Sequence, residues 1–260
     1  WFSTFDIFKF ILSMAIAIIP ARYNSTRFPG KALADIKGKP MVQRVYERCS
    51  KSESIDRVII ATDDERIMEA AKGFGAECIM TSESCESGTE RVFEAVEKLG
   101  LTDEIIVNVQ GDEPFIHHDQ LKQIVSLFED KNTHIATLKR RIEDREDLVN
   151  SNVVKVVSDH FGRAIYFSRC PIPFSREHHI TEMELDNHMY YKHIGLYAFS
   201  SEIIPELKKC RVSSLEKAES LEQLRWIENG YAITIGESSY NSHGIDTPED
   251  IERVLGMLKL

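Results

Sequence analysis

The order of short apolar runs and helical patterns in the first half of the chain constrains the fold most strongly. Apolar runs at residues 15–19, 57–62 and 104–109 are short, and they lack the polar alternation of a half-exposed strand. Helical patterns begin between them at Pro40 and at Ser87, where a first-turn proline and a Ser-x-x-Glu capping box are typical starts. We therefore predict an α/β fold with a doubly wound, mostly parallel, Rossmann-like sheet.

The second half of the chain follows a different pattern from about residue 150. Predicted strands at 153–158, 164–167 and 189–199 have little helical pattern between them, and a hairpin turn is predicted at 159–162. An amphipathic helix is predicted over 214–228. We divide the chain into an α/β core over 14–150, a smaller, partly antiparallel subdomain for substrate binding or dimerisation over 151–213, and a return to the core over 214–260.

Residues 1–13 are apolar and aromatic, and with the run that follows they resemble a membrane segment. Asp6 and Lys9 interrupt this segment, and no basic region precedes it. Its last part is also the first predicted strand, so we expect no stable membrane insertion. Because Met14 is a natural starting residue, we expect residues 1–13 to be a non-native or disordered extension.

Composition narrows the classes of function. The chain has 42 acidic residues against 32 Lys and Arg, a net charge of −10, which argues against a general nucleic-acid binder. An acidic protein can still bind an anionic substrate if its cations are concentrated in one cleft. The five cysteines are odd in number and form no Cys-x-x-Cys pair, so we expect reduced thiols rather than a zinc site or disulfides.

A polar loop follows the first predicted strand, and it is the strongest candidate for a binding site. Open α/β sheets bind their ligands at the carboxyl ends of the strands, and cations with small hydroxyl side chains suit a nucleotide triphosphate. A solvated basic loop is the alternative. The loop fits neither the Walker A motif nor Gly-x-Gly-x-x-Gly. Its polar residues are Arg22, Asn24, Ser25, Thr26, Arg27 and Lys31.

A second candidate stands after the strand at 104–109, in Gln110-Gly111-Asp112. Alternation places Gln110 and Asp112 on one side of the extended chain, and Gly111 permits close approach of the backbone to a ligand. A carboxylate at the carboxyl end of this strand, facing the polar loop, suits Mg²⁺ shared with phosphates. The alternative for Asp112 is an Asx-turn that closes the strand.

Seven short motifs occur in one order along the chain, and together they resemble a known family. They are IPAR with the following Ser, Arg and PGK, then SGTER, VQGDEP, YFSR, HIGLY, LEQLR and DTPED. The order is similar to that of nucleotidyltransferases that activate acidic sugars, and most closely to the 3-deoxy-D-manno-octulosonate (KDO) cytidylyltransferases, or CMP-KDO synthetases. The resemblance covers the chain from Met14 onward.

The resemblance implies a fold and a reaction. The fold would be of the nucleotidyltransferase type. The reaction would convert CTP and KDO to CMP-KDO and pyrophosphate for lipopolysaccharide biosynthesis, with Mg²⁺ as cofactor. It further implies a cytoplasmic homodimer with no nucleic-acid partner.

The resemblance also assigns roles to individual residues. It implies catalytic roles for Arg22, Arg27, Lys31, Asp112 and Asp246, of which Asp112 and Asp246 would bind the metal. It implies nucleotide binding by Arg22, Asn24, Ser25, Arg27, Lys31, Ser87, Gly88, Arg91 and Gln110. It implies sugar binding by Arg169, Arg176, His193, Tyr197, Glu222 and Gln223.

Two other functions remain open at this point. The sugar could be another acid, such as sialic acid or 8-amino-KDO, because a hydroxyl-for-amine difference at one carbon cannot be read from these motifs. The chain could also be a non-catalytic nucleotide-binding regulator of the same fold. Such a regulator would be expected to have lost Lys31, Asp112 or Asp246, and the chain has all three.

Overall fold

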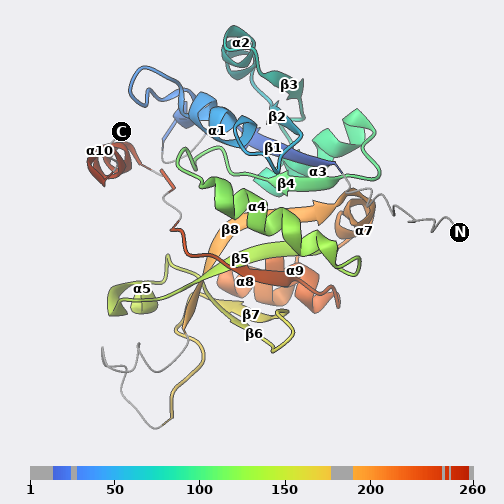
Figure 1. The fold of residues 1–260 in the computed structure, drawn as a ribbon, viewed down its shortest axis with the longest axis vertical. Coiled ribbons are helices and arrows are strands. Elements are labelled where there is room, and N and C mark those ends of the chain that lie inside the picture. The colour runs from blue at the N-terminus through green and yellow to red at the C-terminus, as the bar shows by residue number, and fades with distance from the viewer. Residues whose placement is uncertain (1–13, 25–27, 177–189, 242–243, 246, 258–260) are drawn as a thin grey trace, which may run out of the picture.

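A continuous sheet of nine strands forms the centre of the molecule (Figure 1). The structure is a computed structural model, and it describes residues 14–24, 28–176, 190–241, 244–245 and 247–257. The main path of the sheet runs β3-β2-β1-β4-β8-β5-β9, and β6 and β7 form a hairpin that pairs with β8. The strands are β1 Ala15–Ala21, β2 Arg57–Thr62, β3 Glu77–Met80, β4 Ile105–Asn108, β5 Ile135–Arg141, β6 Lys155–Ser158, β7 Ala164–Ser168, β8 Tyr191–Ser200 and β9 Thr234–Glu237.

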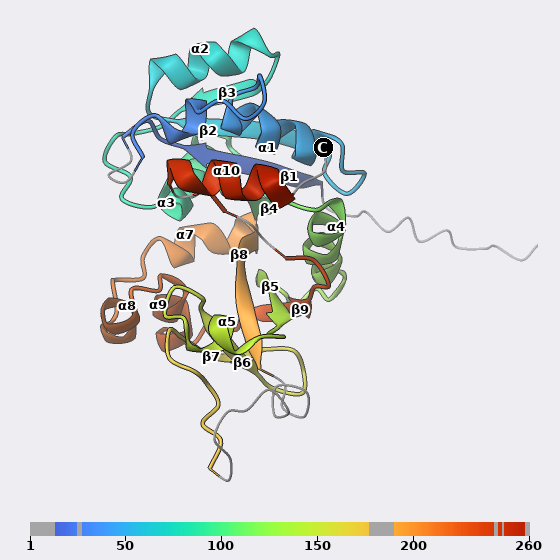
Figure 2. The same ribbon diagram turned by 90° about the vertical axis from the view of Figure 1, so that its left-hand side faces the viewer.

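Helices cover both faces of the sheet, as the doubly wound prediction requires (Figures 1 and 2). Buried side chains of α1, α2 and α4 pack on one face, and those of α3, α7 and α9 pack on the other. The α-helices are α1 Met41–Ser50, α2 Glu65–Gly73, α3 Gly88–Leu99, α4 His118–Ser126, α5 Arg145–Val149, α7 Ile204–Leu207, α8 Ser214–Glu219, α9 Gln223–Glu228 and α10 Pro248–Met257. Short 3₁₀ turns lie at Lys31–Leu33, Leu127–Glu129 and Ser201–Ile203.

Strand β1 shows why the first apolar run has no polar alternation. Its residues are buried throughout, with Ala17 and Ile19 in the core on the α1 side and Ile16 and Ile18 in the core on the α3 side. It pairs in parallel with both β2 and β4. The predicted mixed α/β fold with a mostly parallel sheet is therefore confirmed.

Strand β8 joins the two halves of the chain. It belongs to the predicted subdomain, yet it lies between β4 and β5 and runs antiparallel to both. Its first residues extend past the core and pair with β6 of the hairpin. The predicted antiparallel strand pairs are thus present. However, β8 pairs with strands of both the core and the subdomain. The division of the chain at residues 150 and 213 stays a prediction.

Two local predictions differ from the structure. The helix predicted over 214–228 is wrong, because α8 and α9 are separate helices with Ser220 between them in a left-handed conformation, φ 52°. Strand β9 was not predicted. It has four residues, and Gly236 in it packs where an added Cβ would meet the Leu138 side chain at 3.0 Å.

Candidate functional site

A cleft of about 230 Å³ lies at the carboxyl ends of β1 and β4, where the polar loop was predicted to meet the Asp112 turn. Its walls are the end of β1, the residues after it, the start of α3 and the turn after β4. The structure brings seven of the predicted residues together here. They are Arg22, Lys31, Ser87, Gly88, Arg91, Gln110 and Asp112.

Lys31 and Asp112 face each other across this cleft. The Lys31 ammonium donates to Asp112 Oδ2 at 2.6 Å, and both side chains keep part of their surface exposed. The loop turns into the Lys31 helical turn at Gly30, which has φ +72° and donates its N–H to the Tyr23 carbonyl at 2.8 Å. A cation and a carboxylate in contact at a strand end provide a group for phosphate oxygens and a group for a divalent cation.

The two glycines of the cleft are required by contacts within the chain. A Cβ on Gly111 would lie 2.7 Å from the Pro20 carbonyl oxygen. A Cβ on Gly88 would lie 3.1 Å from Gln110 Oε1 and 3.2 Å from Pro20 Cγ. Gly111 therefore lies against the end of β1, and the close approach to a ligand that was predicted for it stays a prediction. The same strand end sets the positions of α3 and of the Asp112 turn.

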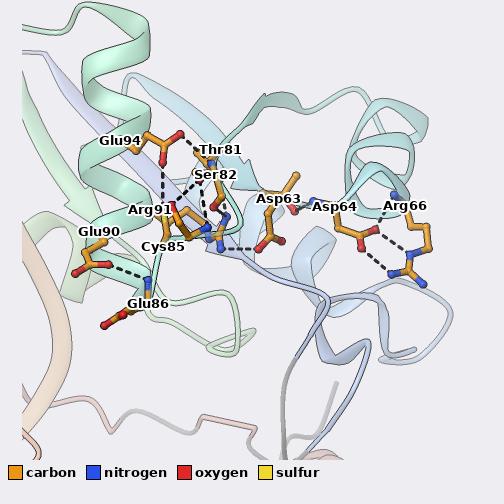
Figure 3. A network of polar contacts seen from close by, with 12 residues as sticks. Asp63, Asp64, Arg66, Thr81, Ser82, Cys85, Glu86, Glu90, Arg91 and Glu94 are labelled. Atoms are coloured by element: carbon orange, nitrogen blue, oxygen red, sulfur yellow. Dashed lines mark hydrogen bonds and ion pairs between the residues drawn. The ribbon is translucent and has the colours of Figure 1, made fainter.

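Arg91 lines the cleft with its guanidinium already engaged. The residue is 2% exposed, and its guanidinium donates to Asp63 Oδ2 at 2.7 Å and to the Thr81 hydroxyl at 2.6 Å (Figure 3). The charge of Arg91 is thereby neutralised by Asp63, which follows β2 directly. Arg91 therefore joins the start of α3 to the residues after β2 and β3 in the cleft wall. Contact between Arg91 and a nucleotide stays a prediction.

The start of α3 carries the predicted Ser87 cap. The Ser87 hydroxyl accepts from the Glu90 N–H at 3.1 Å, while the Glu90 carboxylate accepts from the Glu86 N–H rather than from Ser87. The Ser87 hydroxyl also donates to Glu222 Oε1 at 3.0 Å. This bond links the cleft to a residue that was predicted to contact the sugar.

His193 and Tyr197 of β8 lie side by side, with ring centroids 5.3 Å apart, and Tyr197 is buried while His193 is half-buried. His193 Nε2 is 3.0 Å from the Thr137 hydroxyl, whose own proton faces the Ile194 and Leu196 carbonyls. Carbonyls only accept, so Nε2 carries the proton and Nδ1 is left as an acceptor. Burial lowers the pKa of His193 to about 3, so the ring is neutral at physiological pH.

The hydroxyl oxygen of Tyr197 is buried, and among the described residues no group meets the distance and angle of a hydrogen bond to it. Burial, and then the charge of Glu222, raise the pKa of Tyr197 well above its usual value. Burial also raises the pKa of Glu222, while its hydrogen bonds to Thr89 and Ser87 act in the opposite direction. The hydrogen bond from Ser87 joins Glu222 to the start of α3, and Gln223, the next residue, is buried.

The two predicted sugar-binding arginines lie apart from this cluster. The Arg169 guanidinium donates to three backbone carbonyls, those of Ser151, Glu219 and Ser220, at 2.7–3.3 Å. Arg176 is exposed at the end of the described part of its loop. Of the six residues predicted to bind the sugar, two are buried, three are half-buried and one is exposed: Tyr197 and Gln223, then His193, Glu222 and Arg169, then Arg176.

Several predicted site residues lie outside the described residues or outside the cleft. Ser25, Arg27 and Asp246 belong to the first group. Asn24 is exposed and does not line the cleft. Next to Asp246 in sequence, the Ile245 N–H donates to the Asp112 carbonyl at 2.9 Å, so the backbone at 245 lies against the Asp112 turn.

Two residues that shape the site were missed by sequence reasoning. Asp63 follows a buried strand just as Asp112 does, so its position at a strand end was an available signal. Thr137 gave no signal, because a threonine inside a predicted strand is expected there on propensity alone. Among the described residues no group of three or more His, Cys, Asp and Glu could hold a metal ion.

The comparison with protein families decides the assignment of the chain. A family model described as Cytidylyltransferase matches residues 16–237. The chain belongs to the cytidylyltransferase family. It is therefore a nucleotidyltransferase enzyme, and the cleft lies where the sheet of a doubly wound fold binds its ligand.

Individual relatives of this cytidylyltransferase match nearly its whole length. A protein of Parabacteroides distasonis named 3-deoxy-manno-octulosonate cytidylyltransferase is 51% identical over 94% of the chain and 97% of its own length. One of the same name from Thermodesulfovibrio yellowstonii is 49% identical over 92% and 96%. The solved structure of CMP:2-keto-3-deoxy-manno-octonic acid synthetase complexed with CTP matches with a TM-score of 0.87. It is 38% identical and covers 94% of the chain and 98% of that structure. No described helix of this cytidylyltransferase could span a membrane.

Proposed function

We propose that this cytidylyltransferase activates KDO with CTP, giving CMP-KDO and pyrophosphate. The similarity to relatives of that name, about 50% identical over nearly the whole chain, carries the proposal. The similar structure complexed with CTP supports the choice of nucleotide. The cleft adds chemical support, because Arg22 and Lys31 offer cations to phosphates opposite the Asp112 carboxylate.

The reaction joins the anomeric hydroxyl oxygen of the sugar acid to the α-phosphorus of CTP. The bond between that phosphorus and pyrophosphate breaks as the new bond forms, and the hydroxyl proton is lost. Reactions of this kind depend mainly on positioning and on stabilisation of charge. Arg22 and Lys31 would hold the phosphates and stabilise the pyrophosphate as it leaves, with Arg27 as a further cation of the same loop.

Mg²⁺ is part of the proposal, with Asp112 and Asp246 as its protein ligands. The fit of Asp112 rests on a carboxylate at the end of a central strand in a cleft with cations. A bound Mg²⁺ would neutralise phosphate charge and act as a Lewis acid. Lys31 contacts Asp112 Oδ2 and so helps to orient the carboxylate.

The sugar would bind between this cleft and the group formed by His193, Tyr197 and Glu222. The unprotonated Nδ1 of His193 can accept from a sugar hydroxyl, and the Tyr197 hydroxyl lacks a geometric partner among the described residues. Glu222 can accept from another hydroxyl beside Ser87. The exposed Arg176 is the candidate for the sugar carboxylate, since Arg169 donates to backbone carbonyls.

We also propose a cytoplasmic homodimer. All five cysteines are free, which suits a reducing compartment. Exposed apolar side chains occur in and near the subdomain, and apolar surface of this kind is typical of subunit contacts. They are Val149, Phe161, Ile165 and Phe174.

Pyrophosphate release tests the proposal directly. CTP, UTP, ATP and GTP are each assayed with KDO, 8-amino-KDO and sialic acid, in the presence of Mg²⁺ or of a chelator. We expect release with CTP and KDO that stops when Mg²⁺ is removed. Faster turnover with another sugar would assign the enzyme to that sugar, and no release with any pair would favour the regulator. Asp112→Asn is the matched inactive control.

A further inference from the structure

Two consecutive carboxylates, Asp63 and Asp64, follow β2 and point in opposite directions (Figure 3). Neither belongs to the residues that the motifs assign to substrate. Asp63 makes an ion pair with Arg91 of α3, and Asp64 makes one with Arg66 of α2. The two pairs lead to opposite walls of the nucleotide cleft.

The Asp63 pair connects three elements at one buried point. Arg91 lies in the second turn of α3, and its guanidinium reaches Asp63 after β2 and Thr81 after β3. The side chains of Arg91 and Asp63 are only 3% and 15% exposed. A guanidinium held by a carboxylate and a hydroxyl in such a place fixes α3 in position, because moving the helix would leave a buried charge unpaired.

The position of α3 matters to the cleft because its first residues form one wall. Ser87 and Gly88 line the cleft, and Gly88 packs closely against Gln110 and Pro20, where an added Cβ would lie 3.1–3.2 Å from their side chains. A shift of α3 toward the cleft would therefore cause a collision. A shift away would withdraw the free N–H groups of the helix start from a bound anion.

The Asp64 pair acts on the other wall through Tyr23. Asp64 caps α2 and binds Arg66 in a two-pronged contact, at 2.9 Å to Nε and 2.6 Å to Nη2. The Arg66 guanidinium stacks 3.3 Å from the centroid of the Tyr23 ring. Ring atoms of Tyr23 lie 3.3 Å from where a Cβ of Gly30 would be, next to Lys31.

We propose that Asp63 and Asp64 are positioning residues, each of which holds one wall of the nucleotide cleft. Asp63 holds the α3 wall through Arg91, and Asp64 holds the Lys31 wall through Arg66 and Tyr23. Neither touches the substrate. The inference rests on the proposed function only in taking CTP as the occupant of the cleft.

The Asp63 half is tested with Asp63→Asn, assayed at saturating KDO and then at saturating CTP. We expect kcat/KM for CTP to fall about 10- to 100-fold through displacement of the wall, with KM for KDO changed less than twofold. Calorimetric titration with CTP measures the same loss without turnover. Arg91→Lys keeps the positive charge but loses the planar guanidinium that bonds to two partners. Because both substitutions break the same contact, the double variant with Asp63→Asn should show little further fall in kcat/KM for CTP.

Glu77→Gln is the matched control. It breaks the Arg57–Glu77 ion pair, which joins the same strands β2 and β3 at their amino ends, away from the cleft. Its KM for CTP should equal that of the wild type. A folded Asp63→Asn protein with wild-type CTP affinity would overturn the proposal. If Asp63→Asn does not fold, Thr81→Val decides, since a severalfold loss of CTP affinity supports the proposal and an unchanged affinity overturns it.

The Asp64 half is tested with Arg66→Ala and Tyr23→Phe. Because the Arg66 pair is exposed, we expect only about a threefold fall in kcat/KM for CTP in Arg66→Ala. Tyr23→Phe keeps the ring and should match the wild type, while Tyr23→Ala should match or exceed the loss in Arg66→Ala. Equal activity in Arg66→Ala and wild type overturns this half. If wild-type enzyme binds CTP but releases no pyrophosphate with KDO, the proposed function fails while the affinity comparison still stands.

Discussion

We call the residues predicted to bind the nucleotide the nucleotide half, and those predicted to bind the sugar the sugar half. The two sets differ in how their residues are arranged. In the nucleotide half, residues from three separate motifs converge on one cleft. In the sugar half, the predicted residues come from β8, α9 and a loop, and two arginines lie apart from the rest. The difference follows from topology, since parallel strands deliver their ends to one edge, whereas an antiparallel strand, a helix and a loop share no common edge.

The strongest test of the nucleotide half removes the charge at its centre. Asp112→Asn should lower kcat by about 10²- to 10³-fold, because a group that stabilises charge is lost. The side chain is 31% exposed, so thermal unfolding should change little. If Asp112 is a ligand, the variant should need more Mg²⁺ than the wild type, and high Mg²⁺ should restore part of the turnover. A Mg²⁺ dependence equal to that of the wild type would contradict the role of Asp112 as a ligand.

Adding a methyl group at Gly111 tests whether this glycine is needed for packing within the chain rather than for contact with a ligand. In Gly111→Ala the new Cβ would lie 2.7 Å from a backbone oxygen, so we expect a loss of stability of about 1–3 kcal/mol. Gly195→Ala in β8 is the counterpart in the sugar half, where a Cβ meets nothing within 4 Å. Urea denaturation measures both. Equal stability of the two variants would contradict the tight contact at Pro20.

The same glycines show what sequence reasoning could and could not reach. It predicted that the Asp112 turn and the polar loop would meet, since strand ends determine that. It assigned Gly88 and Arg91 to the nucleotide on the strength of the family resemblance, and the structure supplies contacts within the chain for both. Contacts between distant residues such as Arg91 and Asp63 leave no local pattern. The break at Ser220 was hidden in the same way, because the apolar stripe continues through it.

The next prediction concerns the sugar half alone, where His193 should make the stability of the fold depend on pH. Burial lowers the pKa of His193 from 6.5 to about 3, so below pH 6.5 the unfolded chain binds a proton that the folded protein excludes. Stability should therefore be highest above pH 6.5 and fall as the pH decreases toward 3, with a loss on the order of 2 kcal/mol at pH 5 from this residue. His193→Asn should flatten the curve between pH 5 and 6.5. An unchanged curve in that variant would mean that the ring is solvated.

The smallest expected effect concerns Arg169, where the structure and the family resemblance point to different roles. Three backbone carbonyls accept from its guanidinium, and a lysine ammonium cannot reproduce that fork. We expect Arg169→Lys to lose about 1 kcal/mol of stability, the net value of one or two hydrogen bonds, with KM for KDO unchanged. Arg176→Lys is the comparison, because an exposed arginine should affect KM and not stability. A large rise in KM for KDO in Arg169→Lys would mean that sugar binding draws the guanidinium away from the carbonyls. The arginine would then have a role in the sugar site that its contacts with backbone carbonyls do not reveal.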